Sequence, residues 1–541
     1  MKRNGEWDEV SWEEAIQKIA EVFMKYNGQP CAVIASPNCT NEDNYVLQKF
    51  ARVALNTNHV DFYESFINHG GLKAINQIEG ANSSTPSIQE ISEAKCIFIV
   101  GSNSSQSHPL VAVSIRQAVR KGAKLIVVDP RKIELAALAD LWLQPNPESD
   151  ALLLMGVMKA LFMHSSMNDL FLNTNDENVE RMARLLENLD LSKVERLTSI
   201  SKTQITETAA TLVKHKPVVI LYGTGITQHP SSTESIFTLH NLTLLLGVNH
   251  GPVRLISLLG HNNMVGANDM GAVPDYFPGH MPVEDREGRS QFEEAWQCKI
   301  SEKPGLSYNE ILQGIEHEQI KVLYLIGEIP SMHCLQKLDF LIVQNIFPAK
   351  IMEFAHVVLP SASFAEISGT FTNFEGRVQR VKQVIKPLYQ SKPDWWITCQ
   401  IARKMGVSGF NYKSSTEIME EIAQRVPGYQ MITHRRLNRK GIKRRLNGNL
   451  HKNKFILSGL DTVTLSQDKR FPLTLIIENN LFHYRAGSLV EQVMDMERIK
   501  RENVLVINFD DAEKLGITNG DLVKITCENG HAKSKVRLSD E

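Results

Sequence analysis

Two groups of small and acidic residues have the types and spacing that could bind a nucleotide. The apolar run Cys96–Val100 ends in the small polar turn Gly101–Ser105, and the next apolar run, Leu125–Val128, ends at Asp129. Backbone amides in such a turn can approach a phosphate, and an acid about 20 residues further on can accept hydrogen bonds from a ribose or a base edge. The turn lacks the G-x-G-x-x-G pattern, so a plain α/β core loop is the alternative at this point.

A second turn of the same kind follows the apolar run Pro217–Tyr222. This turn, Gly223–His229, precedes a helix that we predict over residues 231–246. Since the start of a helix favours anions, both strand–turn–helix units could face a phosphate-bearing ligand. Residues 259–280 are too rich in glycine and asparagine for a regular element, and we expect an irregular binding loop there.

The elements that must position these turns are predicted from apolar runs and helical periodicity. Ser11 and Glu14 have the spacing of a capping box, which predicts a helix that continues to about Tyr26. Buried parallel strands are continuous apolar runs, and runs that alternate with helical patterns predict two doubly wound α/β domains. The runs assigned to the second domain are Cys31–Ala35, Lys321–Ile326, Phe340–Gln344 and His356–Leu359.

Composition and charge exclude several classes of protein. The 541 residues carry a formal net charge of −2, which implies no overall attraction to nucleic acid or to a membrane. Seven cysteines are widely scattered and none forms a C-x-x-C pair, which argues against a locally bound iron–sulfur cluster and suits a reducing compartment. The first residues do not resemble a signal peptide, and no apolar run is long enough to span a bilayer. A cytoplasmic protein without membrane insertion is predicted.

The last quarter of the chain changes character twice. Residues 431–454 hold nine basic residues, for which a nucleic-acid patch is one interpretation. No aromatic residues are interleaved for stacking, so a solvated linker or a face for an acidic partner is favoured. Beyond it, the runs at 473–477, 504–507 and 522–525 and the turn at 528–531 predict a β-rich domain. The nine basic residues are Arg435, Arg436, Arg439, Lys440, Lys443, Arg444, Arg445, Lys452 and Lys454.

These motifs together resemble the catalytic subunit of molybdopterin (bis-pterin) enzymes of the formate dehydrogenase type, which is related to the large iron–sulfur subunit of respiratory complex I. The resemblance implies two doubly wound α/β domains of the formate dehydrogenase/DMSO reductase type and a C-terminal β-barrel-like domain, here truncated. The matching strings lie at 101–103 with 108–109, 127–131, 223–229, 261–271, 327–328, 359–363 with 369–373, 377–380, 394–396 and 483–488.

The resemblance also implies two molybdopterin guanine dinucleotides, with molybdenum or tungsten left open. One nucleotide would be held by Gly101, Ser102, Asn103, Asp129, Arg131 and Asp150, with Gly223, Gly225, Gln228 and His229 near the pterin. The other would be held by Gly327, Glu328, Gln344, Ser363, Asn373 and Arg377. The C-terminal domain would close over both through His483, Gly487 and Ser488. Several of these glycines and asparagines could instead serve only to shape turns.

The chain departs from the family at the positions that carry the chemistry. The metal-ligating cysteine or selenocysteine falls on Ile67, the adjacent histidine on Asn68 and the substrate-binding arginine on Leu259. A soft thiolate or selenolate is expected on such a metal, and isoleucine has no lone pair. Leucine cannot bind a carboxylate as an arginine fork does. His69 could partly replace the histidine, although a loop histidine is more often merely exposed.

Two functions remain open. The first is oxidation of formate to carbon dioxide, impaired by the substitutions at Ile67, Asn68 and Leu259, with electrons passed to an iron–sulfur or NAD-linked diaphorase-type partner, because the family's N-terminal four-cysteine cluster domain is missing. The second is a non-catalytic scaffold or electron-transfer-complex subunit that keeps the fold and the pterin. The predicted domains are 1–62 with 300–430, 63–299, a basic linker at 431–455, and an incomplete β-rich domain at 456–541.

Overall fold

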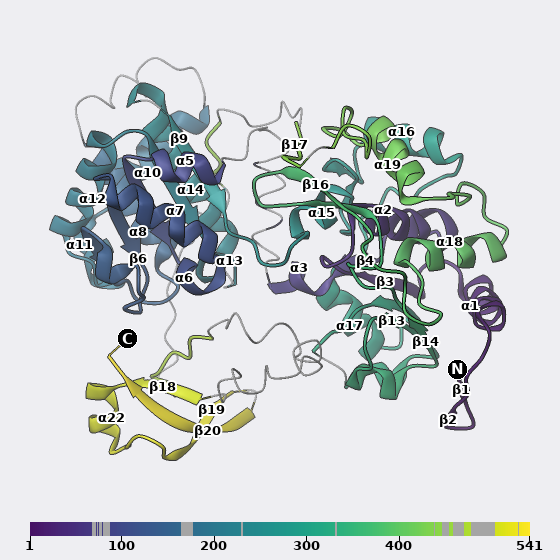
Figure 1. The fold of residues 1–541 in the computed structure, drawn as a ribbon. Helices are drawn as coiled ribbons and strands as arrows, with labels where there is room; N and C mark the ends of the chain where they lie inside the picture. Colours follow the sequence, from purple (N-terminus) through teal and green to yellow (C-terminus); the bar gives the residue numbers. More distant parts are fainter. Residues whose placement is uncertain are drawn as a thin grey trace. The chain divides into compact units, whose positions relative to one another are not determined.

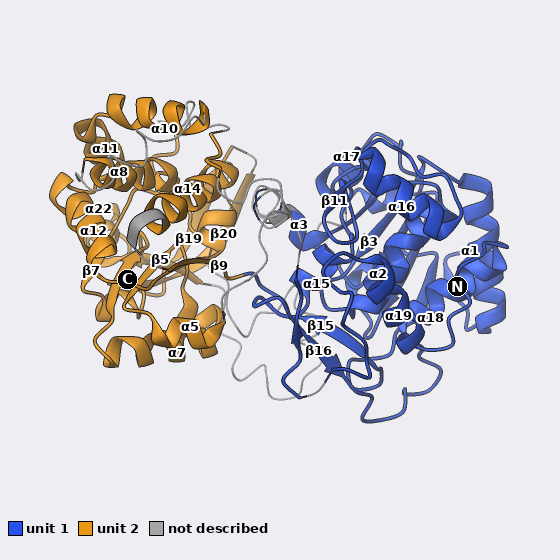
Figure 2. Ribbon diagram, turned by 90° about the horizontal axis from the view of Figure 1, so that it is seen from above, with its two compact units in different colours: residues 1–86, 259–452 blue, residues 87–258, 453–541 orange. Residues whose placement is uncertain are grey.

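The computed structural model divides the chain into two compact units. Unit 1 contains residues 1–86 and 259–452, and unit 2 contains residues 87–258 and 453–541 (Figure 2). Each unit is thus built from two separate stretches of the chain. The structure describes residues 1–67, 72, 74, 78, 87–163, 177–228, 231–250, 252–330, 333–437, 439–445, 454–457, 470–477, 504–528 and 530–540.

A five-stranded parallel sheet forms the centre of unit 1 (Figure 1). Its spatial order is β14-β13-β12-β3-β4. The chain adds β4 on one side of β3, and later adds β12, β13 and β14 in turn on the other side. The order of the strands therefore reverses between β3 and β12. The strands are β3 (Cys31–Ala35), β4 (Val60–Phe62), β12 (Val322–Ile326), β13 (Phe340–Asn345) and β14 (Val357–Pro360).

The sheet of unit 1 is buried on both faces because its strands alternate between two apolar cores. Cys31, Val33 and Ala35 belong to one core, whereas Ala32 and Ile34 belong to the other. Helices α1, α2, α18 and α19 contribute to the first core and α17 to the second. Both faces are covered in this way, as a doubly wound fold requires. The helices are α1 (Trp12–Tyr26), α2 (Asn41–Lys49), α3 (Tyr63–Ile67), α15 (Met264–Asp269), α16 (Arg286–Trp296), α17 (Tyr308–Glu316), α18 (Asp394–Lys404) and α19 (Ser415–Arg425).

The start of α1 shows half of the predicted capping box. The Ser11 hydroxyl accepts a hydrogen bond from the Glu14 N–H at 3.2 Å. The Glu14 carboxylate forms an ion pair with Arg3. The helix begins and ends where the sequence predicts, at Trp12 and Tyr26.

Unit 2 contains a second five-stranded parallel sheet, in the order β7-β6-β5-β8-β9. Every residue of β5 and β8 is buried, which explains why both strands read as continuous apolar runs in the sequence. The strands are β5 (Cys96–Val100), β6 (Lys124–Val128), β7 (Leu141–Leu143), β8 (Val218–Tyr222) and β9 (Val253–Ser257). The helices are α5 (Ile88–Glu93), α6 (Ser104–Ser107), α7 (Pro109–Arg120), α8 (Asp150–Phe162), α10 (Glu177–Asn188), α11 (Leu191–Thr198), α12 (Lys202–Lys214), α13 (Thr224–Thr227) and α14 (Ser232–His250).

A small three-stranded sheet and one helix are described near the C-terminus. The sheet has the order β18-β20-β19, and β19 pairs with β20 across the predicted turn. Among the described residues these strands do not close into a barrel. Residues 473–477, predicted as a strand, adopt no regular structure. The elements are β18 (Val504–Asn508), α22 (Phe509–Leu515), β19 (Leu522–Cys527) and β20 (Gly530–Ser539).

The division between the units differs from the predicted domain boundaries. The sequence placed residues 63–299 in one domain, whereas residues 259–299 lie in unit 1. Arg52, which is 1% exposed, donates hydrogen bonds to the carbonyl oxygens of Gly271, Val273 and Tyr276 at 2.8–2.9 Å. These bonds attach the later stretch to the helical segment that follows α2.

The imidazole of His59 makes the stability of unit 1 depend on pH. Its Nδ1 accepts a hydrogen bond from the Leu306 N–H at 2.9 Å, and its Nε2 lies 2.7 Å from the Gln29 Oε1, so the ring is neutral. Burial lowers the pKa of His59 to about 4 from an ordinary value of 6.5. As the pH falls, protons therefore bind His59 in the unfolded chain before they bind it in the folded chain. The contribution of neutral His59 to the free energy of unfolding, about 3 kcal/mol, is present above pH 6.5 and is lost as the pH falls towards 4.

A His59→Gln variant tests this dependence. The difference in unfolding free energy between the wild type and the variant, measured by urea titration at several pH values, should shrink by up to about 3 kcal/mol between pH 6.5 and pH 4. Using the difference cancels the opposite effect of Asp61, a residue that both proteins contain and whose pKa burial raises to about 7 in the wild type. A difference that stays constant over this range would contradict the assignment.

Candidate functional site

The two predicted turns of unit 2 meet at the carboxyl edge of its sheet. Gly101 follows β5 and Gly223 follows β8, and the order of the strands reverses between these two neighbours. Ligands of doubly wound sheets bind outside the carboxyl ends of the strands at such a reversal. The Gly225 N–H donates to the Gly101 carbonyl oxygen at 2.9 Å, so the turns are in direct contact.

Glycine is required where the two turns touch. Gly101 has φ +57°, and a Cβ on Gly225 would lie 2.8 Å from the Gly101 Cα. A Cβ on Gly223 would lie 2.8 Å from the Cβ of Ser102. Any side chain at 225 would therefore push the two loops apart.

Asp129 lies at the carboxyl end of β6 and is 4% exposed. Its Oδ1 accepts a hydrogen bond from the Arg131 N–H at 2.9 Å and lies 3.5 Å from the Arg131 Nε. The Trp142 Nε1 donates to the Asp129 carbonyl oxygen at 2.9 Å, which fixes the backbone of this turn. The predicted pair of Asp129 and Arg131 is thus brought together beside β5.

Asp150 is the first residue of α8 and lies near Asp129. Burial raises the pKa of Asp150 to about 7, and the negative charges of Asp129 and Glu148 act in the same direction. A carboxyl group with this pKa can donate or accept a hydrogen bond near neutral pH.

Hydroxyl groups complete the edge of unit 2. The Ser102 and Ser104 hydroxyls lie 2.9 Å apart and are buried, and Asn103 stands between them in the turn. Ser257 ends β9, and its hydroxyl is buried without a hydrogen-bond partner among the residues that the structure describes. Gln228, at the end of α13, is exposed. This edge therefore combines amide, hydroxyl and carboxyl groups.

The carboxyl edge of the unit 1 sheet holds some of the residues predicted for the second nucleotide. Gly327 follows β12 with φ +88°, and its N–H donates to the Gln344 carbonyl oxygen at 2.8 Å. Glu328 accepts a hydrogen bond from the Asn345 Nδ2 at 3.1 Å. Ser363 lies just beyond β14, and its N–H donates to a carboxylate oxygen of Glu366.

The other three residues predicted for this nucleotide form side-chain hydrogen bonds within unit 1. The fully buried amide of Gln344 accepts from the Tyr324 hydroxyl and donates to Asp394. Asn373 and Arg377 lie in the hairpin between β15 (Gly369–Thr372) and β16 (Arg377–Val381). The Asn373 Oδ1 accepts from the Arg377 N–H at 3.0 Å, which stabilises the hairpin turn.

The structure describes only some of the three positions at which this chain departs from the family. Leu259 is 8% exposed and belongs to the apolar core of unit 1. Ile67 is the last residue of the short helix α3, and only its backbone is described. The remaining predictions, on Asn68, His69, His229, His483, Gly487 and Ser488, lie outside the described residues.

A histidine–glutamate pair beside these positions was missed by the sequence analysis. The His261 Nε2 lies 3.2 Å from the Glu64 Oε1, and the two side chains are 16% and 5% exposed. His261 has φ +60°, which is uncommon for a residue with a side chain. Because the two residues are almost 200 positions apart, no local pattern could have paired them; the only signal was a histidine within the matched string at 261–271.

The stretch 259–280, predicted to be an irregular binding loop, is instead largely built into the core. It contains α15, and Asp269 at its end is fully buried. Asp269 accepts from the Tyr429 hydroxyl at 2.7 Å, forms an ion pair with Arg444 at 2.6 Å, and its Oδ1 lies 2.7 Å from the His280 Nε2. The carboxylate of Asp269 is therefore fully engaged in contacts within unit 1.

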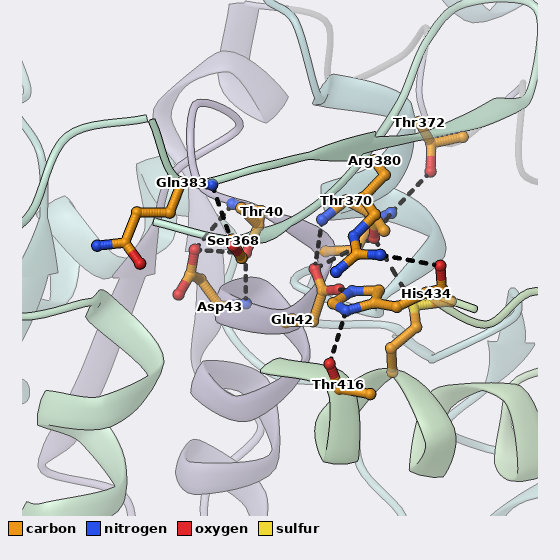
Figure 3. A network of polar contacts seen from close by, with 12 residues as sticks. Thr40, Glu42, Asp43, Ser368, Thr370, Thr372, Arg380, Gln383, Thr416 and His434 are labelled. Atoms are coloured by element: carbon orange, nitrogen blue, oxygen red, sulfur yellow. Dashed lines mark hydrogen bonds and ion pairs between the residues drawn. The ribbon is translucent and has the colours of Figure 1, made fainter. Parts of the chain in front are cut away.

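The predicted basic linker is also tied to unit 1. Besides Arg444, His434 is buried, and its Nε2 lies 2.7 Å from the Glu42 Oε1 (Figure 3). Glu42 accepts in addition from the Thr370 N–H at 2.8 Å. The described part of the segment up to Arg445 is therefore a packed part of the unit, although Arg435, Arg436, Arg439 and Lys440 are exposed.

The fold and the unit 2 edge define a doubly wound α/β protein with a nucleotide-type site at the reversal point of a parallel sheet. Comparison with known proteins specifies the class. A family model described as "Molybdopterin oxidoreductase" matches residues 1–404, and one described as "Molydopterin dinucleotide binding domain" matches residues 473–541. The chain therefore belongs to the molybdopterin oxidoreductase family.

Proteins of similar sequence and structure support the assignment to this family. The chain is 33% identical to the F420-dependent formate dehydrogenase subunit alpha of Methanocaldococcus jannaschii, over all of this chain and 84% of that protein. It is 32% identical to the probable oxidoreductase YjgC of Bacillus subtilis, over all of this chain and 58% of that protein. The acetylene hydratase of Pelobacter acetylenicus has the same fold, with a TM-score of 0.78 at 17% identity over 99% of this chain and 82% of that one.

The family cofactor is a molybdopterin dinucleotide, and the unit 2 edge fits such a group. Its diphosphate needs amide and hydroxyl donors and close approach to the backbone, which the touching glycine turns and the Ser102 hydroxyl provide. Within the described residues, no three His, Cys, Asp or Glu side chains are grouped to hold a metal ion. In the same parts of the chain, every helix is too short or too polar to cross a bilayer.

Proposed function

We propose that this chain is a formate dehydrogenase-type subunit that holds molybdopterin guanine dinucleotide and whose formate oxidation is impaired. The observation that carries the cofactor role is the contact between the Gly101 and Gly225 turns beside Asp129, at the strand reversal of unit 2. The nucleotide would contact Gly101, Ser102, Asn103 and Asp129. When bound, the group would supply the two-electron redox chemistry of the family.

Impairment is supported by the side chains at the substituted positions. The aliphatic side chain of Leu259, packed in the core, cannot pair with the carboxylate of formate. Oxidation of formate releases carbon dioxide, one proton and two electrons. In this proposal His261, held by Glu64, is the candidate proton acceptor in place of Asn68, and an iron–sulfur or NAD-linked diaphorase-type partner accepts the electrons.

The second candidate is a scaffold that keeps the fold without the reaction. The burial of Leu259 favours it, whereas the close glycine turns of unit 2 favour a cofactor holder. The proposed compartment is the cytoplasm, which is supported by seven cysteines that are all free thiols.

Pterin and metal analysis separates the two candidates. The full chain would be purified from a host able to make the cofactor, and bound guanine dinucleotide, molybdenum and tungsten would be measured. Bound pterin with slow formate-dependent dye reduction, made faster by Ile67→Cys and abolished by His261→Gln, would support the enzyme. A folded protein without pterin would leave only the scaffold.

The Asp129 carboxylate is expected to contribute to nucleotide binding. Asp129→Asn keeps an oxygen that can accept from the Arg131 N–H, so the turn is preserved while the charge is lost. We expect about tenfold weaker retention of the dinucleotide, since one hydrogen bond to a charged group contributes about 1.5–3 kcal/mol. Asp140→Asn is the matched control, because Asp140 pairs with Lys124 at the opposite edge of the same sheet. Equal pterin content in both variants would exclude Asp129 from the site.

A further inference from the structure

Two buried carboxyl groups of unit 1 have no role in the proposed function. Asp43 lies in the first turn of α2 and Asp394 is the first residue of α18, and they are only 2% and 6% exposed. The Trp395 N–H donates to the Asp43 Oδ1 at 2.9 Å, so the Asp43 side chain reaches the residue next to Asp394. These two groups are here called the carboxyl pair. Both can ionise only at a high cost, because like charges repel strongly where water is excluded.

Asp394 connects the strands of the unit 1 sheet at their carboxyl ends. Its Oδ1 accepts hydrogen bonds from the Gln344 Nε2 on β13 and, at 2.6 Å, from the Ser361 hydroxyl just beyond β14. Its Oδ2 accepts from the Cys39 thiol, in the loop after β3, at 3.6 Å. Gln344 in turn accepts from the Tyr324 hydroxyl on β12. One carboxylate is therefore linked to four of the five strands or to the loops that follow them, and its three donors favour the ionised form.

Asp43 is placed to be the protonated member of the pair. Its Oδ2 accepts from the Thr40 N–H at 2.9 Å, and the Thr40 hydroxyl, which can accept from a protonated carboxyl group, lies beside the same oxygen (Figure 3). Burial raises the pKa of Asp43 to about 7, and the negative charge of Asp394 acts in the same direction. Burial also raises the pKa of Asp394, but its hydrogen bonds from Gln344 and Ser361 act against this.

No cation compensates the carboxyl pair among the residues that the structure describes. The charged residues of α1 are exposed, and those of the other elements packed against α2 and α18 are engaged elsewhere. Tyr324 and Cys399, which face the pair, carry no charge near neutral pH, because burial raises both pKa values, that of Cys399 to about 12. The engaged groups are Glu42 with His434, Lys49 with Glu421, Asp269 with Arg444, Glu417 with the Lys413 N–H, and Arg52 with three carbonyl oxygens.

We propose that Asp43 and Asp394 share one proton in the folded chain, and that the junction of α2, α18 and the carboxyl ends of the unit 1 strands opens with release of this proton to solvent. With the proton on Asp43, the pair carries a single negative charge, which the three donors of Asp394 stabilise. Without it, two like charges face each other in a buried place. This inference goes beyond the proposed function, because the opening requires neither pterin nor formate.

The direction of the pH dependence follows from the proton count of the two states. Opening admits water, so the pKa of Asp43 returns towards its ordinary value of 3.8. Between these two pKa values the closed junction binds one proton more than the open junction. The stability of the closed junction is therefore fully present below about pH 4, falls as the pH rises, and becomes constant above about pH 7.

Hydrogen–deuterium exchange of the full chain measures this opening. The amides of residues 391–396, which include the Trp395 N–H, are followed by mass spectrometry between pH 5 and pH 8, with the intrinsic pH dependence of amide exchange divided out. The opening constant of the wild type should rise up to about 100-fold between pH 5 and pH 7 and then stay level. In Asp43→Asn, whose neutral amide imitates the protonated group, it should not change with pH. Asp285→Asn, at the exposed start of α16, is the matched control, because asparagine also caps helices, and it should behave as the wild type.

Infrared spectroscopy detects the proton itself, through the carbonyl band that protonated carboxylic acids show and carboxylates lack. At pH 6 Asp43→Asn should lack one such group that the wild type has. In Asp394→Asn the group on Asp43 should ionise at a lower pH than in the wild type, because the neighbouring negative charge is gone. Asp61, whose pKa burial also raises, is present in all these proteins and cancels in the difference spectra.

Three results would overturn the proposal. The first is an opening constant for residues 391–396 of the wild type that does not change with pH. The second is the same pH dependence in Asp43→Asn as in the wild type. The third is an equal number of protonated groups in these two proteins at pH 6. If Asp43→Asn does not fold, an unchanged infrared titration in Asp394→Asn decides against the shared proton in the same way.

Discussion

Replacing Gly225 with alanine is expected to remove most of the bound dinucleotide from unit 2. The new Cβ would lie 2.8 Å from the Gly101 Cα and 2.9 Å from its carbonyl oxygen, and neither backbone atom can move aside as a flexible side chain could. The two turns must separate, and the hydrogen bond between them at 2.9 Å is strained or lost. Overpacking of this kind costs about 1–3 kcal/mol, which corresponds to roughly 10–100-fold weaker retention.

The measurement is pterin released from equal amounts of folded wild-type and variant protein. Gly247→Ala is the control, because a Cβ at Gly247 meets no atom within 4 Å and alanine favours the helix α14. The control should keep its pterin. If Gly225→Ala also keeps full pterin with unchanged affinity, the dinucleotide does not bind at the touching turns.

The sheets were predictable because their strands are buried on both faces. β3 and β5 coincide with the predicted runs Cys31–Ala35 and Cys96–Val100, and β8 begins one residue later than predicted. A strand between two apolar cores is a continuous apolar run, and such a run can be seen locally. Residues 473–477 have the same local pattern without a strand, so the pattern alone is insufficient where no neighbouring strand is described.

Contacts between distant residues could not be predicted in the same way. Asp269 and Arg444 form an ion pair at 2.6 Å, yet nothing near Arg444 in the sequence distinguishes it from the exposed basic residues beside it. The same holds for His434 with Glu42 and for His261 with Glu64. The positions of Gly101 and Asp129 could be seen in the sequence because each directly follows a strand. The buried hydrogen bonds of Gln344 with Tyr324 and Asp394 could not, because these residues are distant in the sequence.

The buried guanidinium of Arg52 is expected to be the most sensitive point in unit 1. All five of its N–H groups are used: besides the three carbonyl oxygens of residues 271–276, the acceptors are Asn58 at 3.2 Å and Gln48 at 2.6 Å. The guanidinium also lies over the Phe277 ring, 5.2 Å from its centroid. Burial lowers the pKa of Arg52 to about 9, so the group remains charged at neutral pH.

Arg52→Met should destabilise unit 1 by about 3–5 kcal/mol, because two buried carbonyl oxygens and a partly buried one lose their donors, and removing a buried charge offsets only part of this cost. Arg52→Lys should cost nearly as much, since one ammonium group cannot reach acceptors arranged around a planar fork. Thermal unfolding and limited proteolysis of the segment 271–276 measure the effect, and Arg403→Met, an exposed arginine on α18, should change stability by less than about 0.5 kcal/mol. A stable Arg52→Met protein with residues 271–276 still protected would show that apolar packing around Phe277, and not the guanidinium, attaches this stretch to unit 1.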